Sequence, residues 1–382
     1  MNSIPVFKVF MSPDVLAPLT DVLFSGYIGQ GTKVDEFEKL LSESVGVPYA
    51  VTVNSGTSGL HLALRLLQKQ NDADNQAGWE PGDEVLTTPL TCTATNWAIL
   101  ANNLRLKWVD IDTSTGNIDP QDMAERLSPT TKAIMAVHWG GYACDLEALK
   151  QVQEICRDRY GFTPPIIEDC AHAWGAKYKG KMIGSHGNLS VFSFQAIKSL
   201  TTGDGGVLTT TSPEIDERAR LLRWYGLDRT SNKDFRCEQD VEEWGYKFHM
   251  NDINATLGLG NLPHIPGLIS VQRENAAFYD RALRGVPGIT LIQQDHSDCE
   301  SSYWLYTIRV ERRDDFTRKM LEAGISVSRV HDRNDKHSCI QEFRAHLPGT
   351  DAFCADMICI PVGWWVTPED RQYIADQIKA GW

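Results

Sequence analysis

One lysine stands where an apolar run meets a glycine-rich stretch. Lys198 follows the largely apolar residues 191–197 and comes shortly before residues 203–206, which read Gly-Asp-Gly-Gly. An amine in apolar surroundings loses hydration, which disfavours its charged form, lowers its pKa and frees it as a nucleophile and base. The glycines let the backbone fold tightly beside a flat ligand. Taken alone, Lys198 would still be interpreted as an ordinary surface lysine, so other residues must decide.

A turn of small residues lies earlier in the chain. Residues 54–59 read Asn-Ser-Gly-Thr-Ser-Gly and connect an expected strand to an expected helix. In such a turn, backbone N–H groups and hydroxyls converge on an anion, helped by the positive end of the helix dipole. Ser55, Gly56 and Thr57 are therefore candidates to hold a phosphate, although Ser and Thr are also common as ordinary helix N-caps. The turn has neither the GxxxxGK[ST] pattern nor GxGxxG, which weakens the nucleotide-hydrolase and dinucleotide alternatives.

An acidic residue ends a short apolar segment. Asp169 follows Ile166, Ile167 and Glu168, which places it at the carboxyl end of an expected strand, where α/β sheets hold ligand groups. A carboxylate buried there needs a cation or strong donors, and a protonated pyridine nitrogen is one such cation. The alternative is a helix N-cap or a structural ion pair, which is the commoner role of a single aspartate at this place.

The three features occur in the order phosphate turn, strand-end carboxylate and desolvated lysine. Together they supply an anion site, a partner for a pyridinium nitrogen and an imine-forming amine, which are the three requirements of pyridoxal 5'-phosphate. The combination favours the functional interpretation of each residue over its structural alternative. The sequence therefore predicts a pyridoxal-phosphate site.

The elements that must position these residues alternate between short β-rich segments and amphipathic helices. This alternation is typical of βαβ units around a mainly parallel sheet flanked by helices, so we expect an α/β fold. The expected strands of this sheet are residues 49–53, 84–88, 106–111, 133–138, 166–168, 189–194 and 207–210. The chain length and the breaker at residues 263–267 predict a large domain over residues 1–262 and a smaller α/β domain over residues 263–382. In the smaller domain we expect strands at residues 302–310 and 325–330.

The overall composition excludes some classes of partner. The 382 residues carry a formal net charge of −13, which argues against a nucleic-acid binder because such binding rests on clustered lysine and arginine. The nine cysteines form no CxxC pair and no metal-ligand cluster, so we expect reduced thiols and no metal. The N-terminus lacks the pattern of a signal peptide, and no run of about 18 apolar residues could span a membrane. We therefore expect a cytoplasmic protein.

Four separated segments resemble the DegT/DnrJ/EryC1/StrS family of sugar aminotransferases, which has the aspartate-aminotransferase fold, or fold type I. They are residues 26–38, 53–64, 168–172 and 193–206, in the order of that family, and the resemblance extends over nearly the whole chain. The resemblance implies a large domain around a mainly parallel sheet of seven strands and a smaller C-terminal α/β domain. It also implies pyridoxal 5'-phosphate as the cofactor and a homodimer with shared active sites.

The cofactor-binding positions of the family can be matched one by one in this sequence. The resemblance implies that Lys198 is the catalytic lysine, bound to the aldehyde carbon, and that Asp169 pairs with the ring nitrogen. It assigns the cofactor phosphate to Gly56, Thr57, Ser193 and, from the neighbouring subunit, Lys247, and Ser55 is a further cofactor-binding candidate in the same turn. Many relatives carry asparagine at the position of Lys247 and others carry lysine, which would add a point charge there.

Two positions depart from the commoner pattern of the family. Cys92 stands where relatives often have an aromatic residue stacked on the cofactor ring, which leaves a smaller, polarizable face. Trp97, about one helical turn further on, is a candidate to compensate, and the alternative is that it belongs to the core. His172 stands where glutamine is usual. We expect it to contact the cofactor hydroxyl, and the alternative is a histidine satisfied by local hydrogen bonds.

The resemblance implies transfer of an amino group from L-glutamate to a keto-sugar carried by a nucleotide, in amino-sugar or polysaccharide biosynthesis such as that of O-antigen. The expected sugar is a 4-keto-6-deoxyhexose linked to UDP, GDP or dTDP. A branch of the family has histidine in place of the lysine and dehydrates sugars, so the presence of Lys198 favours amino transfer. Dehydration or another pyridoxal-phosphate reaction is one alternative, and a non-catalytic regulatory member of the fold is another.

A diphosphate substrate needs cations near the pocket. Arg229 and Arg333 are candidates to pair with the diphosphate, weighed equally against plain surface charge. His331 lies in a stretch whose counterpart in relatives approaches the sugar, and Tyr27 lies in the first matched segment. These four residues are the predicted substrate contacts.

Overall fold

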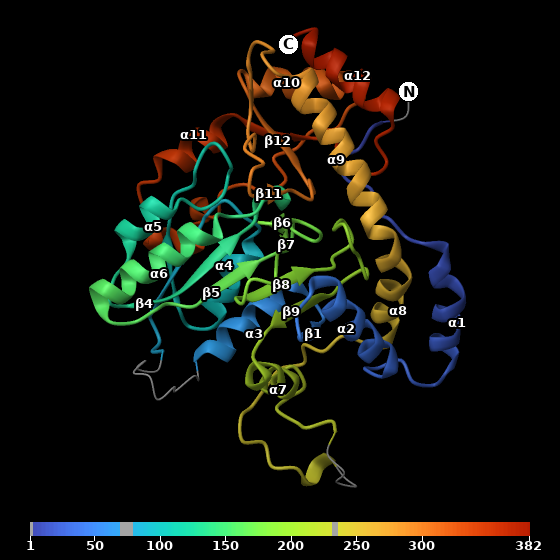
Figure 1. Ribbon diagram of the computed structural model, residues 1–382, viewed down its shortest axis with the longest axis vertical. Coiled ribbons are helices and arrows are strands. Elements are labelled where there is room, and N and C mark those ends of the chain that lie inside the picture. Colours follow the sequence, from blue (N-terminus) through green and yellow to red (C-terminus); the bar gives the residue numbers. More distant parts are fainter. Residues whose placement is uncertain (1–2, 69–78, 231–235) are drawn as a thin grey trace.

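The computed structural model describes residues 3–68, 79–230 and 236–382. Its central feature is a seven-stranded sheet with the strand order β1-β9-β8-β5-β4-β2-β3 (Figure 1). Five neighbouring strands, from β8 to β3, are parallel, and β9 runs antiparallel to both of its neighbours. The strands are β1 (Tyr49–Val53), β2 (Glu84–Thr87), β3 (Arg105–Trp108), β4 (Thr131–Val137), β5 (Ile166–Asp169), β8 (Leu189–Ser193) and β9 (Gly206–Thr210). The mainly parallel sheet expected from the sequence is confirmed.

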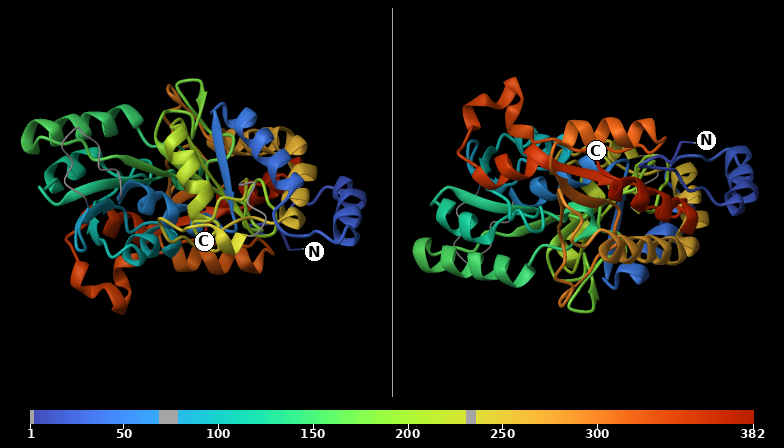
Figure 2. Two further views of the ribbon diagram at one scale, coloured as in Figure 1. Left: turned by 90° about the horizontal axis from the view of Figure 1, so that it is seen from below. Right: turned by 90° about the horizontal axis from the view of Figure 1, so that it is seen from above.

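Helices cover both faces of this sheet, as a mainly parallel sheet requires (Figure 2). One face packs against three helices, α3 (Gly56–Gln68), α4 (Thr93–Ala101) and α7 (Pro213–Leu222). The other face packs against α2 (Thr32–Val45), α5 (Pro120–Arg126), α6 (Leu146–Tyr160), α8 (Asp252–Asn261) and the start of a long helix described below. The strands are therefore buried on both sides, and polar ligand groups are confined to the strand ends.

A second sheet, β10-β12-β13, is antiparallel and supports the C-terminal part of the chain. Its strands are β10 (Ile289–Leu291), β12 (Tyr306–Val310) and β13 (Met357–Ile360). They share a separate core with α9 (Ile265–Ala282), α10 (Arg313–Glu322) and α12 (Pro368–Lys379). The long helix α9 contributes Ile265 and Ile269 to the core of the large sheet, and Ala276 and Tyr279 to this second core (Figure 1). The predicted boundary at residue 262 falls just before this connecting helix.

The remaining elements are short or peripheral. α1 (Leu16–Phe24) lies at one edge of the molecule beside α8, and α11 (Pro348–Asp356) lies at the opposite edge (Figure 1). A small third sheet contains β6 (Lys177–Tyr178), β7 (Lys181–Met182) and β11 (Cys299–Glu300). The 3-10 helices are η1 (Pro13–Val15), η2 (Trp139–Gly141), η3 (Arg236–Glu238), η4 (Leu262–His264), η5 (Asn334–Lys336) and η6 (Ser338–Phe343). Within the described ranges, none of the helices combines the length and apolar character needed to cross a membrane.

Two strands expected in the C-terminal part differ from the structure. The strand expected at residues 302–310 begins only at Tyr306, because the N–H groups of residues 302 and 305 bond to the backbone of residues 140–141 instead. The strand expected at residues 325–330 is wrong. These residues contribute isolated bridges, and Val330 has a φ of 62°, which lies outside the β region.

A buried ion-pair network fixes α2 against β1 and α7. Glu38 accepts hydrogen bonds from Arg220 and Arg223, and from both the backbone N–H and the hydroxyl of Thr52. Burial would raise the pKa of the Glu38 carboxyl, but the two guanidinium groups together hold it below its usual value. The carboxylate is therefore ionised in the folded protein and depends on both arginines.

We predict that Glu38→Gln destabilises the fold by about 3 kcal/mol, because it leaves the buried Arg223 without its carboxylate. Urea unfolding at neutral pH measures this loss. The control, Glu36→Gln, removes only an exposed pair with Lys33 and should cost less than about 1 kcal/mol. Equal losses in the two variants would contradict the role given to Glu38.

The same network predicts a pH dependence. The folded-state pKa of Glu38 lies below its ordinary value of 4.5. Its stabilising contribution is therefore complete above about that pH and is lost as the pH falls through the folded-state pKa. The difference in unfolding free energy between wild type and Glu38→Gln should shrink in acid over that range.

Candidate active site

A pocket of about 380 Å³ opens where β1, β5 and β8 end, beside the start of α4. These strand ends belong to neighbouring parts of one sheet, which is where α/β folds place their ligand groups. The pocket brings together every predicted cofactor residue except Lys247, namely Ser55, Gly56, Thr57, Cys92, Asp169, His172, Ser193 and Lys198.

The turn between β1 and α3 forms a narrow cradle at one end of the pocket. α3 begins at Gly56, and the Ser55 hydroxyl accepts a hydrogen bond from the Ser58 N–H at 3.0 Å. Ser55 is thus a helix cap, as its alternative interpretation expected. A Cβ on Gly56 would lie 2.9 Å from the Cβ of Ser193, so only glycine allows this close approach of the turn to β8. The N–H groups of a first helical turn have no partner inside the helix, so the cradle suits an anion.

Asp169 lies at the end of β5 with 5% of its surface exposed. Its carboxylate accepts a hydrogen bond from Thr95 Oγ1 at 2.7 Å and another from the Ala171 N–H at 3.0 Å. Burial raises the pKa of Asp169, while Thr95, Ala171 and the charge of Lys198 oppose that rise. A carboxylate with two such donors keeps acceptor capacity for a protonated ring nitrogen.

Thr95 is a site residue that the sequence analysis missed. It lies in the first turn of α4, and its hydroxyl is also 2.8 Å from the hydroxyl of Thr91. Because the single hydroxyl proton of Thr95 goes to Asp169, Thr95 accepts the proton of Thr91. A threonine in a helix is no signal by itself. Its role follows only from a contact between residues 74 positions apart.

Lys198 lies a few residues beyond β8; the residue as a whole is half-buried, and its amine group is buried. Burial lowers the pKa of Lys198 to about 7, and the nearby Asp169 and Cys92 oppose the fall. At neutral pH a large share of the amine is therefore uncharged and nucleophilic. The amine nitrogen lies 3.6 Å from the centre of the Trp304 ring, a neighbour that the sequence analysis did not name.

His172 is buried beside Lys198. The Gly140 N–H points at its Nδ1 at 3.4 Å, so the ring proton is on Nε2. Burial, followed by the charge of Lys198, lowers the pKa of His172 well below its usual value, and the ring is therefore neutral. The imidazole stacks on Trp304 with 4.0 Å between ring centres. One nitrogen is thus satisfied locally, and Nε2–H is the ring's remaining donor.

Cys92 occupies the N-cap position of α4 and lines the pocket half-exposed. Trp97 does not line the pocket. It packs against the core between α3, α4 and the sheet, and its ring centre lies 5.9 Å from that of His337. This position agrees with the core alternative for Trp97, and it leaves Cys92 without an aromatic substitute from the same helix.

His331 reaches the pocket from the C-terminal part of the chain. Its ring stacks parallel to that of His172 with 5.3 Å between centres. A turn at residues 328–330 orients the His331 side chain toward the pocket. Val330 adopts a left-handed conformation that is costly for a β-branched residue, and its N–H bonds to Ser328 Oγ at 3.0 Å. Burial lowers the pKa of His331 to about 3, and its Nε2 has no hydrogen-bond partner among the described residues.

Asn334 fastens the segment that carries His331 to the start of α4. Its side chain donates to the Thr91 carbonyl and accepts from Asn96 Nδ2, each at 2.8 Å. Its backbone N–H bonds to the Pro89 carbonyl at 2.8 Å. Asn334 is 1% exposed, so these bonds compete with little water. The loop before α4 and the segment with His331 are therefore held in one fixed arrangement.

Arg333 does not line the pocket. Its guanidinium pairs with Asp335, at 2.6 Å, and with Asp351. The hydrogen bond to Asp335 is the largest cause that raises the pKa of Arg333, so its charge is already compensated within the chain. To bind a diphosphate, Arg333 would first have to break its ion pairs with these two carboxylates.

Tyr27, Arg229 and Lys247 do not line the pocket either, but they lie on neighbouring segments. Arg229 donates a hydrogen bond at 2.7 Å to the carbonyl of Gln30, which lies three residues after Tyr27. The guanidinium carbon of Arg229 also lies 4.7 Å from the centre of the Trp224 ring. The backbone of Trp224 in turn pairs with that of Lys247 in an isolated antiparallel β-bridge. Tyr27 is 85% exposed and Lys247 is also exposed. The three predicted residues therefore gather on one surface outside the pocket.

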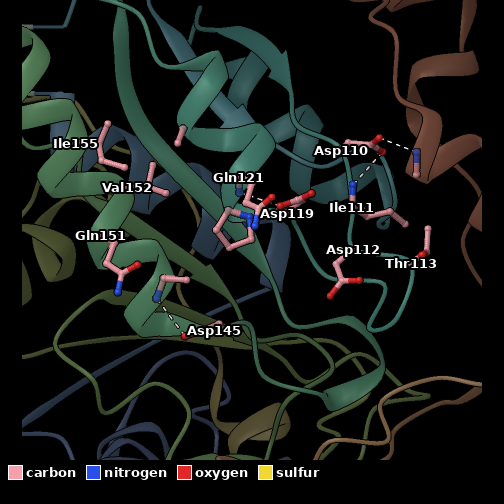
Figure 3. A pocket seen from close by; sticks show the side chains of 14 residues that line it. Asp110, Ile111, Asp112, Thr113, Asp119, Gln121, Asp145, Gln151, Val152 and Ile155 are labelled. Atoms are coloured by element: carbon pink, nitrogen blue, oxygen red, sulfur yellow. Dashed lines mark hydrogen bonds between the residues drawn. The ribbon is translucent and has the colours of Figure 1, made fainter.

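A larger hollow, of about 790 Å³, lies beside α5, α6 and the segment that follows β3 (Figure 3). Its described lining residues include four aspartates and neither lysine nor arginine. Asp110 accepts the N–H groups of residues 349 and 350 at the start of α11, while Asp119 and Asp145 cap α5 and α6. An anionic ligand would be repelled there, so the smaller pocket around Lys198 is the candidate site.

A buried cluster behind Asp169 resembles a metal site in composition alone. One ligand-type atom from each of His138, Glu168 and Cys170 lies within 4.8 Å of the others. His138 Nδ1 accepts the Cys144 N–H at 3.0 Å, and its Nε2 donates to Glu168 at 2.9 Å. A neutral imidazole has one lone pair, and here the Cys144 N–H uses it. The cluster is a satisfied hydrogen-bond network.

The residues around the pocket fit pyridoxal 5'-phosphate. The cradle at Gly56 has no space for a side chain, which suits the close approach of a phosphate. Asp169 retains acceptor capacity inside the protein, and the amine of Lys198 is partly uncharged at neutral pH. A flat cofactor with a phosphate, a ring nitrogen and an aldehyde needs these three groups in one cavity.

Comparisons with known proteins point to the same class of enzyme. The sequence profile of the DegT/DnrJ/EryC1/StrS aminotransferase family matches residues 11–379. The crystal structure of AtS13 from Actinomadura melliaura is 49% identical, with a TM-score of 0.95 and coverage of 100% of both chains. Sugar aminotransferase CalS13 from Micromonospora echinospora is 45% identical, with a TM-score of 0.93 over 99% of this chain and 100% of that chain. The spore coat polysaccharide biosynthesis protein SpsC from Bacillus subtilis (strain 168) is 34% identical over 81% of this chain and 76% of SpsC.

We predict that Thr95→Val weakens binding of pyridoxal 5'-phosphate by about tenfold, because Asp169 loses a hydrogen bond that favours its charged form. The loss should be larger at about pH 6 than at about pH 8, since a higher pKa protonates Asp169 first at the acidic end. Titration of tryptophan fluorescence with the cofactor measures the dissociation constant. The matched control is Thr93→Val, because Thr93 is the first residue of the same helix and makes no hydrogen bond to Asp169 among those that hold this carboxylate. Equal affinity of Thr95→Val and wild type at both pH values would contradict the role of Thr95.

Proposed function

The chain belongs to the DegT/DnrJ/EryC1/StrS aminotransferase family, and from that membership we propose that it moves an amino group from L-glutamate to a keto-sugar linked to a nucleoside diphosphate. Enzymes of this family are pyridoxal-phosphate-dependent sugar aminotransferases that act on nucleotide-linked sugars. The observation that carries the proposal is the meeting of a partly uncharged lysine, a buried carboxylate and an anion cradle in one pocket. The donor and the identity of the sugar are the proposed parts.

Lys198 is the proposed base and acid of the reaction. When bound, pyridoxal phosphate draws electrons from the carbon that carries the transferred nitrogen, which makes the hydrogen on that carbon acidic. The Lys198 amine, with its pKa of about 7, takes that proton from the α-carbon of the amino donor. In the second half of the reaction it delivers a proton to the sugar carbon that receives the nitrogen.

Asp169 is the proposed partner of the ring nitrogen. Its carboxylate is held in place by Thr95 and by the Ala171 N–H, and it is removed from water. A fixed negative charge at this position keeps the ring nitrogen protonated without competing solvent. His172, neutral and with its proton on Nε2, is the proposed donor to the cofactor hydroxyl.

We also propose that two copies of the chain complete each site. The described residues that line the pocket offer a phosphate no cationic side chain other than Lys198, which is needed at the opposite end of the cofactor. Lys247, Arg229 and Tyr27 lie outside the pocket on one surface, and Phe24 of the nearby helix α1 is 86% exposed. Exposed aromatic side chains beside a lysine that lies outside the pocket of its own copy are what a homodimer with shared sites would bury.

The proposed sugar is a 4-keto-6-deoxyhexose linked to UDP, GDP or dTDP. His331, whose Nε2 has no partner among the described residues, would face the sugar, and Arg229 of the second copy would meet the diphosphate. Arg333 is a weaker candidate for the diphosphate because two aspartates already hold it. CalS13 is called a sugar aminotransferase and SpsC a polysaccharide biosynthesis protein, which supports a role in making amino sugars for a polysaccharide.

Incubation of the enzyme with L-glutamate and a panel of keto-sugar nucleotides, followed by mass spectrometry, tests the reaction. We expect an amino sugar nucleotide and 2-oxoglutarate in equal amounts, and no product from Lys198→Ala. Loss of water from the sugar without glutamate consumption would indicate a dehydratase. A protein that binds no cofactor and turns over no sugar would be a non-catalytic member of the fold. Either result would overturn the proposal.

Mixed dimers test whether Lys247 serves the other copy. We predict that Lys198→Ala and Lys247→Glu are each strongly impaired, and that co-expressed heterodimers recover about half of the wild-type activity. One of the two sites then combines an intact Lys198 with an intact Lys247. The matched control is Lys150→Glu on α6, an exposed lysine away from these segments, which should leave activity unchanged.

The contrary outcome is equally specific. The Lys247 carbonyl accepts a hydrogen bond from Asn54 Nδ2 at 3.1 Å, so its backbone lies next to the cradle of its own copy. If Lys247 served its own cradle, neither site of the heterodimer would be intact. Activity would then stay as low as in the single variants, although the heterodimer forms.

A further inference from the structure

Trp304 is fixed in the fold by the backbone around it. The N–H of Ser302 and the N–H of Leu305 bond to the carbonyls of residues 141 and 140, each at 3.1 Å. The Ser302 hydroxyl also donates to the His172 carbonyl at 3.0 Å. Trp304 therefore belongs to the segment that joins the C-terminal part to the edge of the pocket, and the residue is 4% exposed.

The ring of Trp304 contacts Lys198 in two ways. Its indole N–H donates to the carbonyl of Ile197, the peptide that precedes the lysine, at 2.9 Å. Its face meets the lysine amine, with 3.6 Å from the nitrogen to the ring centre. Phe7, from the N-terminal segment, stacks on the same indole with 5.1 Å between centres. The tryptophan thus holds both the backbone and the amine of Lys198.

The other groups that face this amine are Asp169 from β5, Cys92 from the start of α4, and the rings of His172 and His331. Both histidines are neutral, so Asp169 is the anionic partner among them. In the proposed function that carboxylate belongs to the ring nitrogen of the cofactor. An aromatic face stabilises an ammonium group without adding a carboxylate that would keep it permanently protonated.

Trp304 lies behind the lysine. It is absent from the described lining of the pocket and instead lines a hollow of about 10 Å³ with Phe7, Ser199 and Lys198 itself. That space holds one water molecule at most. The side chain of Lys198 therefore separates the pocket from this aromatic surface, and its amine is in contact with the surface.

From this geometry we propose that Trp304 is the resting place of the Lys198 amine while that amine is not bonded to the cofactor. The inference rests on the proposed function, and it adds that the donor amine replaces the lysine amine at the carbon that Lys198 would hold. One carbon–nitrogen linkage forms as the other breaks, the two protons of the donor nitrogen pass to the lysine nitrogen, and no electrons are gained or lost. Trp304 then acts as a positioning residue that keeps the freed amine beside the carbons between which it moves a proton.

The test uses the enzyme loaded with pyridoxamine 5'-phosphate, in which the lysine amine is free. Acetylation of Lys198 is followed by mass spectrometry of its peptide over a range of pH, and the midpoint of the rate gives the pKa of the amine. Trp304→Leu should lower the midpoint by about one unit, because the charged amine loses its aromatic face. Trp304→Phe keeps a weaker face and should lower it by less. Phe7→Leu removes a ring that stacks on the indole but leaves the indole itself in place, and it should leave the midpoint unchanged.

Each result decides the proposal. An unchanged or raised midpoint in Trp304→Leu would overturn it, since a tryptophan that merely excludes water would raise the pKa when removed. If Trp304→Leu does not fold, as judged by circular dichroism, the comparison of Trp304→Phe with wild type decides by the same criterion. The labelling needs no sugar substrate, so a failure of the proposed sugar chemistry in the wild type would leave this measurement intact and distinguishable.

Discussion

The structure depends on the removal of one amine and one carboxylate from water in the same pocket. Burial lowers the pKa of Lys198 to about 7 and raises that of Asp169, and each charge opposes the shift of the other. Without burial the lysine would be protonated and unable to act as a nucleophile. Without the opposing interactions the aspartate would lose its charge more readily. The pocket therefore holds a partly uncharged amine beside a buried carboxyl group at neutral pH, which is the combination that the proposed amino transfer requires.

The strand order of the large sheet brings the amine and the carboxylate together. β5 and β8 are neighbouring parallel strands, so the carboxylate at the end of one and the lysine beyond the end of the other lie at the same edge. The helices on both faces exclude water from the strands that lead there. α4 adds Thr95, whose hydroxyl holds the carboxylate in place. Glu168, the residue before Asp169 on β5, is hydrogen-bonded to the buried His138.

The C-terminal part of the chain completes the site from the other side. His331 lines the lysine pocket, and Trp304 meets the Lys198 amine from behind it. Both rings come from segments that are far from Lys198 in sequence, and both stack on His172. Asn334 ties the segment that carries His331 to α4 through one hydrogen bond and to the loop before α4 through two more. Val330, beside His331, has a left-handed backbone conformation. A valine keeps this strained conformation only where the surrounding contacts hold it, and the hydrogen bonds of Asn334 are such contacts.

The sequence by itself determined the parts of the site that depend on local order. Lys198, Asp169 and the turn at Gly56 follow from strand ends and small residues, which an alternating α/β pattern places at one edge whatever the remaining contacts are. The mainly parallel sheet followed from the same pattern. Only the tertiary structure decided that Thr95 holds Asp169, that Trp304 meets the lysine amine and that Arg333 is paired with aspartates. These contacts join residues that are distant in sequence or lie in irregular segments, where neither periodicity nor residue type indicates which partner a side chain will meet.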